Sequence, residues 1–228
     1  MATLYIVATP IGNLEDITLR ALRILKEADL IACEDTRVTK KLLDHYEIQK
    51  PLISYHQHSK VEKIDFLVYK VKEGKNVAVV SDAGTPGISD PGGLLVKAAA
   101  AAGIKVEVIP GASALAAAVS LSGLAMDKFI FLGFLPHKKG RETLIKEIIS
   151  AKYPVVFYES VHRIQKALEQ LYEFGLDREI VVCRELTKMF ETVYRGSVKA
   201  VLNQLSDKEV KGEFVVIISQ RSNLKSQS

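Results

Sequence analysis

The sequence predicts an α/β protein of two domains, an N-terminal one with a mostly parallel sheet and flanking helices and a C-terminal one of mixed α+β type. In the first half, short β-branched runs alternate with helical periodicities, which is typical of a parallel sheet covered on both faces. In the second half, three strand-like runs follow only one clear long helical pattern. The 228 residues are enough for two domains of about 110 residues each.

In the first half, strands and helices are expected in alternation. The expected strands are residues 3–8, 30–33, 77–81 and 105–109. The expected helices are residues 18–28, 61–73, 91–102 and 112–122, with Asp16 or Thr18 capping the first and Asp90 and Pro91 starting the third. An alanine-rich helix ends in a short linker at residues 122–127, which predicts domains at residues 1–123 and 124–221.

In the second half, strands predominate. They are expected at residues 129–132, 155–158, 180–183, 192–196 and 214–219. One helix is expected to start with Ser160 as its N-cap and to end at Gly175, with an apolar face at Val161, Ile164, Leu168 and Leu171.

Composition is that of a soluble enzyme, with 48% hydrophobic and 25% charged residues. Each apolar run is broken before the roughly 18 residues of a membrane span, and the first residues lack the basic start of a signal peptide. We therefore expect a cytoplasmic protein. Cys33 and Cys183 each end an apolar run, which predicts buried, reduced thiols and no metal site.

The formal charge of +4 is unevenly distributed, because residues 1–124 hold equal numbers of acidic and basic side chains. Its strongest cluster is His137-Lys138-Lys139-Gly140-Arg141, which would attract an anionic partner such as a nucleic-acid backbone. A solvated lysine-rich loop explains the same residues.

The segment Gly84–Gly93 is the most informative in the chain, since it holds four of the 14 glycines and two of the 7 prolines. Few side chains cover its backbone, and it follows an expected buried strand, where open α/β sheets bind small ligands. A tight turn before a helix is the alternative interpretation.

Three further motifs follow expected strands of the first half. Thr9-Pro10-Ile11-Gly12-Asn13 is either a ligand loop or a plain connection. Cys33-Glu34-Asp35-Thr36-Arg37 groups two carboxylates with a guanidinium, which an ion-paired helix start also explains. Pro110-Gly111-Ala112-Ser113-Ala114 allows close approach of a ligand or of another backbone.

Two charged motifs follow strands of the second half, Tyr158-Glu159-Ser160 with His162 and Arg163, and Cys183-Arg184-Glu185-Leu186-Thr187-Lys188. His56 and His58 share one face of an extended segment, and we favour surface or structural roles for them over catalysis.

Taken together, the segments LYIVATPIGNLEDIT, ACEDTR, SDAGTPGISDPG, PGASA, FYES-HR and CRELTK resemble the tetrapyrrole methylase superfamily, in the family's order and over nearly the whole chain. The first loop, ATPIGN, stands where porphyrin-precursor methylases have a GxGPGD-type sequence. In this loop the chain instead resembles the branch of the family that methylates a cytidine ribose 2′-hydroxyl in 16S ribosomal RNA. The chain also ends earlier than many relatives of that branch.

The resemblance implies a two-domain fold, a homodimer, and S-adenosyl-L-methionine held in the cleft between the domains, with 16S ribosomal RNA or the small ribosomal subunit as partner and no membrane. The family's cofactor contacts fall on Pro10, Ile11, Asp82, Ala83, Gly84, Thr85, Ile88, Ser113, Ala114, Tyr158 and Leu186.

Methyl transfer to a hydroxyl also requires removal of a proton. From their charges and strand-end positions, we hypothesise that Asp35 or Glu159 accepts it. Orientation of a neighbouring phosphate falls to one of three cations, Arg37, Arg163 or Lys188. A buried structural ion pair is the rival interpretation for Glu159 with Arg163. Two other functions stay open: methylation of a precorrin-type tetrapyrrole, and RNA binding without catalysis.

Overall fold

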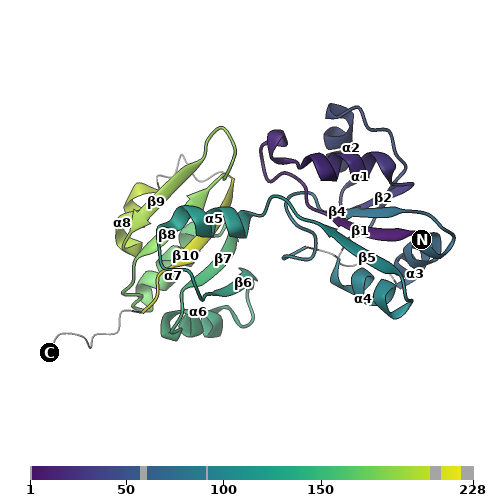
Figure 1. Ribbon diagram of the computed structural model, residues 1–228. Coiled ribbons are helices and arrows are strands. Elements are labelled where there is room, and N and C mark those ends of the chain that lie inside the picture. The colour runs from purple at the N-terminus through teal and green to yellow at the C-terminus, as the bar shows by residue number, and fades with distance from the viewer. Residues whose placement is uncertain (1, 57–60, 91, 206–211, 222–228) are drawn as a thin grey trace. The chain divides into compact units, whose positions relative to one another are not determined.

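The computed structural model describes residues 2–56, 61–90, 92–205 and 212–221 (Figure 1). Its contacts divide the chain into two compact units, Met1–Ser113 (unit 1) and Ala114–Ser228 (unit 2). The expected boundary lay later, at residues 122–127. The difference is helix α5 (Ala114–Ser122), which packs against strand β10 (Glu213–Ile218) and so belongs with unit 2.

Unit 1 contains a five-stranded sheet in the order β3-β2-β4-β1-β5, and every pairing in it is parallel. The strands are β1 (Thr3–Val7), β2 (Leu30–Cys33), β3 (Leu52–Ser54), β4 (Val77–Val80) and β5 (Lys105–Ile109). All four residues of β4 are buried, as expected for a strand covered on both faces. The predicted parallel sheet is confirmed.

Helices cover both faces of this sheet, as Figure 1 shows. They are α1 (Leu19–Glu27), α2 (Thr36–His45), α3 (Val61–Lys72) and α4 (Gly93–Ala101). The apolar sides of α1 and α2 share a core with Val7 and Ala78, whereas those of α3 and α4 share another with Leu4 and Val77. Strand side chains alternate between the two cores because successive residues point to opposite faces.

The start of α1 agrees with the sequence, because the Thr18 hydroxyl accepts a hydrogen bond from the Ala21 N–H at 3.1 Å. Of the two predicted caps Thr18 is therefore the one used, and Asp16 lies in a 3₁₀ turn (Leu14–Asp16). No range was predicted for α2 or β3. The three residues of β3 are only half-buried, which leaves a weak pattern.

The predicted start of α4 was wrong. Its N-cap is Gly92, at φ +151°, and not Asp90; Pro91 lies outside the described residues. A Cβ at Gly92 would lie 3.3 Å from the Gly87 nitrogen, so the preceding turn folds back on itself before the helix starts.

Unit 2 contains a five-stranded mixed sheet in the order β6-β7-β10-β8-β9. The strands before β10 are β6 (Ile130–Phe134), β7 (Val155–Ser160), β8 (Ile180–Arg184) and β9 (Thr192–Gly196). Only the β6–β7 pairing is parallel. The predicted mixed α+β character is confirmed.

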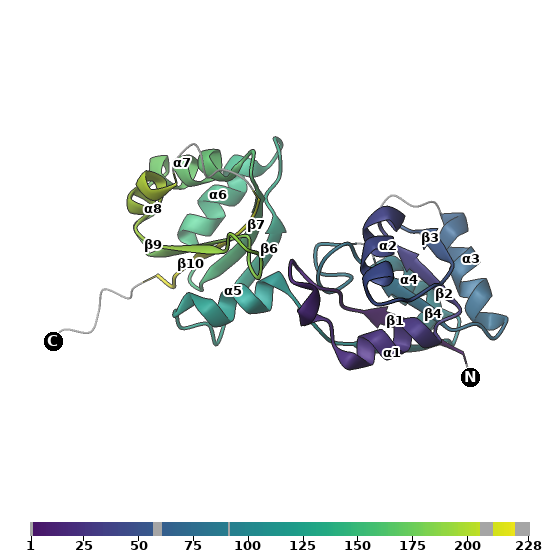
Figure 2. The same ribbon diagram turned by 90° about the horizontal axis from the view of Figure 1, so that it is seen from above.

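Three helices cover one face of this sheet and α5 covers the other, as seen in Figure 2. The three are α6 (Arg141–Ser150), α7 (Ile164–Glu173) and α8 (Val198–Gln204), whose buried residues form one core with Phe157 and Phe214. The sequence prediction singled out only α7. Its Ile164, Leu168 and Leu171 are buried as predicted, and Gly175 follows at φ +81°.

Ser160 does not cap α7, contrary to the prediction. It is the last residue of β7 and pairs with Glu213, so the chain turns before the helix starts at Ile164. Its hydroxyl instead accepts a hydrogen bond from Arg163 Nε at 3.2 Å.

Both cysteines are buried free thiols, as predicted. Burial raises the pKa of Cys33, and raises that of Cys183 to about 11, so both are protonated at neutral pH. In the described part of the chain, no group of His, Cys, Asp and Glu side chains could hold a metal ion. None of the helices described is both long enough and apolar enough to span a membrane.

Candidate functional site

In unit 1, the loops after β1 and β4 join at the carboxyl edge of the sheet. Thr9 and Gly84 form an isolated antiparallel bridge, in which each N–H donates to the other residue's carbonyl, at 2.9 and 3.0 Å. The Thr9 hydroxyl donates to the Ser81 carbonyl at 3.1 Å. Thr9 and Gly84 are 75 residues apart in the sequence, and this bridge holds their two loops together.

The loop after β5 joins the same arrangement, because the Thr85 hydroxyl donates to the Ala112 carbonyl at 3.1 Å. One edge of the sheet therefore carries most of the residues that the resemblance assigned to the cofactor. They are Pro10, Ile11, Asp82, Ala83, Gly84, Thr85, Ile88 and Ser113.

Two glycines make the close approach of these loops possible. Gly84 has φ +83°, and a Cβ there would lie 3.3 Å from Ile11 Cγ2. A Cβ on Gly111 would lie 3.0 Å from Ala8 Cβ. At Gly111, the loop after β5 therefore packs closely against Ala8, which agrees with one of the two interpretations of this loop.

Carboxylates gather beside this edge, at the ends of β2 and β4. Asp82 Oδ1 accepts a hydrogen bond from the Asp35 N–H at 2.9 Å. Burial raises the pKa of Asp82, and burial together with the nearby Asp82 charge raises that of Glu34. The Glu34 carboxylate accepts no hydrogen bond from the residues the structure describes.

Asp35 has the opposite electrostatic behaviour. Its carboxylate accepts hydrogen bonds from the Arg37 N–H at 2.8 Å and from Arg37 Nη2 at 2.6 Å. Arg37 holds the pKa of Asp35 at about 2, so this carboxylate is ionised and a weak proton acceptor at neutral pH. Asp35 also caps α2, which agrees with the predicted ion-paired helix start.

In unit 2, the predicted pair of Glu159 with Arg163 is part of a larger buried network. Arg163 Nη2 lies 2.8 Å from Glu159 Oε1, and Arg141 Nη1 lies 3.2 Å from Glu159 Oε2. The Glu159 side chain is 0% exposed. With both oxygens occupied by guanidinium groups, Glu159 fits the structural ion pair better than the role of proton acceptor.

Arg141 itself is buried, although the sequence grouped it with an exposed basic cluster. Its Nε donates to Gln170 Oε1 at 2.8 Å. The exposed positive charge of that cluster therefore comes from Lys138 and Lys139.

The loop after β8 carries Leu186 and Lys188 in an unusual conformation. Glu185 and Thr187, on either side of the buried Leu186, have φ of +51° and +66°. Lys188 Nζ contacts Glu185 Oε1 at 2.8 Å and Glu213 Oε2 at 2.9 Å. Left-handed conformations at two non-glycine residues are uncommon and concentrate at functional sites.

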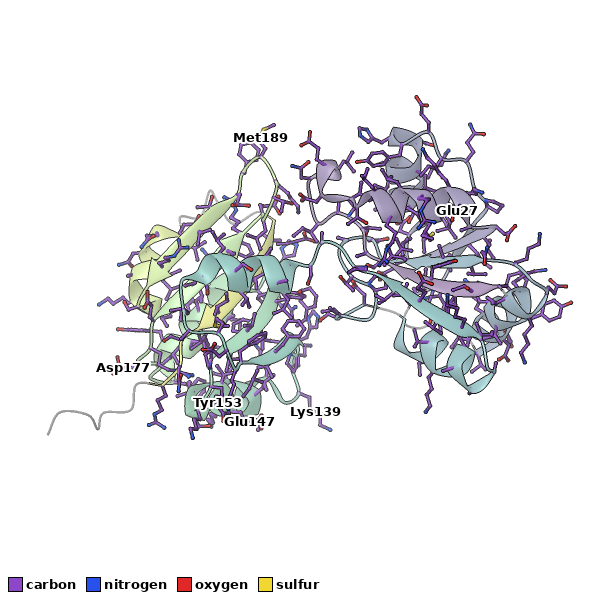
Figure 3. The ribbon with its side chains drawn as sticks, in the orientation of Figure 1. Glu27, Lys139, Glu147, Tyr153, Asp177 and Met189 are labelled. Atoms are coloured by element: carbon purple, nitrogen blue, oxygen red, sulfur yellow. The ribbon has the colours of Figure 1, made fainter. Side chains whose placement is uncertain are left out.

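The tip of this loop is the exposed Met189, which Figure 3 labels at the outer end of the loop. Tyr158, another of the assigned cofactor contacts, lies on β7 and makes edge contacts with Phe131 and Phe134. Ala114 starts α5. Unit 2 therefore contains Ala114, Tyr158 and Leu186 of the cofactor set and Glu159, Arg163 and Lys188 of the catalytic set.

Comparisons with known proteins identify the family and the fold. The family model described as Tetrapyrrole (Corrin/Porphyrin) Methylases matches residues 3–202. The chain belongs to this family. The fold is that of its solved members: a cobalt precorrin-4 methyltransferase superposes with a TM-score of 0.67 at 18% identity, covering 95% of this chain and 94% of the other. The uroporphyrin-III-C-methyltransferase of Thermus thermophilus gives 0.64 at 23%, with the same coverage.

Much higher sequence identity is found with a second group of proteins. Ribosomal RNA small subunit methyltransferase I of Halalkalibacterium halodurans is 48% identical over 95% of this chain and 75% of its own length. The protein of the same name from Thermotoga maritima is 46% identical over 96% and 99%. The family and the two-domain fold inferred from the motifs are thus confirmed.

Four residues of these two regions were not assigned a catalytic or cofactor role from the sequence. Thr9 and Ser81 stabilise the loops, Arg141 completes the Glu159 network, and the Glu34 carboxylate accepts no hydrogen bond within the described part of the chain. Glu34 lay within a charged motif, so its position was a usable signal. His56 is exposed, and His58 lies outside the described residues.

Proposed function

We propose that the chain is an S-adenosyl-L-methionine-dependent methyltransferase that acts on the ribose 2′-hydroxyl of a cytidine in 16S ribosomal RNA. The observation that carries this proposal is the identity of 46–48%, over nearly all of this chain, with two proteins named ribosomal RNA small subunit methyltransferase I. Their substrate class is the best guide to this one, since the tetrapyrrole-modifying structures share the fold at only 18–23% identity.

The edge of the unit 1 sheet is chemically suited to the cofactor. Its bridged loops expose backbone groups around Gly84, where any Cβ would crowd Ile11, and Asp82 adds a carboxylate that could accept hydrogen bonds. We propose that Pro10, Ile11, Asp82–Thr85, Ile88 and Ser113 hold the cofactor. The resemblance assigns three further cofactor contacts to residues of unit 2, Ala114, Tyr158 and Leu186. When bound, S-adenosyl-L-methionine supplies a methyl group on a positively charged sulfur.

Residues of unit 1 are also suited to accept the hydroxyl proton and to orient the RNA. Burial raises the pKa of Glu34 and Asp82, which makes them stronger proton acceptors than Asp35, whose pKa Arg37 lowers to about 2. We propose that Glu34 accepts the hydroxyl proton and that Arg37, whose side chain is 86% exposed, orients a neighbouring phosphate.

Two other cations are less suited to that second role. All three cations are paired with carboxylates, but the side chains of Lys188 and Arg163 are only 29% and 17% exposed. At saturating RNA, a Glu34→Gln variant is expected to lose turnover while Asp35→Asn keeps most of it. Equal losses would return Asp35 to the role of proton acceptor.

The decisive experiment is transfer of radiolabel from S-adenosyl-L-methionine to 30S particles from a strain that lacks this methylation, followed by mapping of the labelled nucleoside. Label on the 2′-oxygen of one cytidine supports the proposal. A parallel reaction with a precorrin-type tetrapyrrole provides the contrast. Label only on the tetrapyrrole, or RNA binding without transfer, would overturn it.

The RNA substrate bears on where the enzyme works, and the family resemblance bears on its oligomeric state. We propose that it acts in the cytoplasm, where small subunits are assembled, and as a homodimer. Sedimentation of the purified protein at micromolar concentration tests the dimer.

A further inference from the structure

The end of strand β6 exposes an aromatic side chain at the edge of the unit 2 sheet. Its parallel pairing with β7 runs Ile130↔Val155 and Phe131↔Val156, then slips to Phe134↔Tyr158, which leaves one extra residue on β6. Gly133, at φ +62°, allows this bulge. Phe134 is left 53% exposed, with one edge contact to the Tyr158 ring at 5.4 Å.

The loop that follows carries concentrated positive charge. His137, Lys138 and Lys139 are all exposed, and Figure 3 shows Lys139 projecting outward from the loop. Neither lysine makes an ion pair with any residue that the structure describes, whereas Lys146 in the next helix pairs with Glu142 at 2.7 Å. Both ammonium groups are thus available to an anionic partner.

The buried Glu159 network anchors the base of this loop. Arg163 Nη1 donates to the Leu135 carbonyl at 2.9 Å, and Arg141 Nη1 donates to the Pro136 carbonyl at 3.1 Å. Each guanidinium also binds Glu159. The network therefore binds the two successive backbone carbonyls that lie between Phe134 and the lysines. This fixes the position of the Phe134 ring relative to the lysine charges. Such preorganisation reduces the entropy lost on binding.

An exposed ring followed within five residues by two unpaired lysines suits a single RNA strand. Aromatic side chains stack with unpaired bases, and lysines neutralise the phosphates between them. We infer that residues 134–139 are an RNA-strand contact surface, with Phe134 stacking on a base, Lys138 and Lys139 binding phosphates, and Glu159 acting as a positioning residue. This inference rests on the proposed function, because it assigns part of the RNA site.

The test uses the full-length protein and 16S ribosomal RNA stripped of protein, with binding measured from 50 to 200 mM salt. A Lys138→Gln/Lys139→Gln double variant is expected to reduce the slope of log affinity against log salt by about 1.4, which corresponds to two phosphate contacts on a single strand. The matched control is Lys166→Gln/Lys199→Gln, which removes two other exposed lysines of unit 2 and should leave the slope unchanged.

A Phe134→Leu variant tests the stacking separately, with Phe174→Leu, another exposed phenylalanine of unit 2, as its control. Binding of RNA is expected to weaken about tenfold for Phe134→Leu alone. Both loop variants should raise the KM for 30S particles, leave kcat nearly unchanged, and bind S-adenosyl-L-methionine as the wild type does.

The outcomes separate the two hypotheses. If the wild type methylates RNA and the loop variants keep the wild-type affinity and salt dependence, the inferred contact surface is wrong and the proposed function stands. If the wild type neither binds nor methylates RNA, both are wrong.

Discussion

The strand ends of unit 1 and those of unit 2 are held in place by different interactions. In unit 1, the loops after β1, β4 and β5 are joined by backbone and hydroxyl hydrogen bonds, and Gly84 lets them approach. In unit 2, the ends of β6 and β7 are joined by a buried carboxylate between two guanidinium groups. Backbone contacts leave side chains and other backbone groups for a small ligand, whereas the ion-pair network occupies both oxygens of its buried carboxylate.

Under the proposed function, the two regions have separate duties. The edge of unit 1 is suited to hold a cofactor, and the network of unit 2 is suited to fix a basic loop for a larger anionic partner. Substitutions in the two regions should therefore affect different measurements. The largest loss of stability is expected in the Glu159 network, and the smallest effects are expected at the single carboxylates of unit 1.

The largest effect is expected from Glu159→Ala, which leaves Arg141 and Arg163 as unpaired charges in a buried site. Breaking such a pair costs about 3–5 kcal/mol of unfolding free energy, measurable by urea denaturation. The control is Glu142→Ala, since Glu142 pairs with Lys146 on the surface with a side chain 64% exposed, and its loss should change stability by about 0.5 kcal/mol or less. Similar losses in both variants would contradict a structural role for Glu159.

A smaller loss of stability, with a larger loss of cofactor binding, is expected from Gly84→Ala. The left-handed backbone at φ +83° costs a non-glycine residue about 1–2 kcal/mol, and the new Cβ would crowd Ile11. Gly103→Ala is the matched control, because Gly103 has φ +70° with no atom within 4 Å of an added Cβ. Calorimetric titration with S-adenosyl-L-methionine should show weakened binding for Gly84→Ala only; equal affinities would remove these loops from the cofactor site.

A pH-dependent effect is expected from Asp35→Asn. Arg37 lowers the folded-state pKa of Asp35 from 3.8 to about 2, so its ionised form favours the folded state above about pH 4. That contribution is lost as the pH falls through 2. The stability difference between wild type and variant, from urea unfolding at several pH values, should therefore be present at pH 7 and vanish toward pH 2. A difference that stays constant would show that Arg37 and Asp35 are not coupled.

The smallest effect on stability, and of opposite sign, is expected from Asp82→Asn. Burial raises the folded-state pKa of Asp82, so its ionised form opposes folding at neutral pH, and an asparagine keeps the oxygen that accepts from the Asp35 N–H. The variant should gain less than about 1 kcal/mol at pH 7, a gain that disappears below the unfolded pKa, and should bind the cofactor more weakly. Lower stability at pH 7 would contradict this sign.

The sequence by itself determined the features that depend on neighbouring residues. Strand–helix alternation predicted the parallel sheet of unit 1, Thr18 was one of two predicted N-caps for α1, and the Gly/Pro-rich segment after β4 was predicted to be a loop at a strand end. The ordered motifs also identified the family. These features follow from side-chain periodicity and from local backbone preferences.

Only the tertiary structure decided which distant residues meet. Thr9 pairs with Gly84, Arg141 leaves the exposed basic cluster to bind Glu159, and α5 joins unit 2. Local rules also failed at Ser160, because pairing with Glu213 extends β7 through the predicted cap. Each of these contacts joins residues that are far apart in the sequence. Such contacts form only when the helices and strands pack together, so local side-chain periodicity does not predict them.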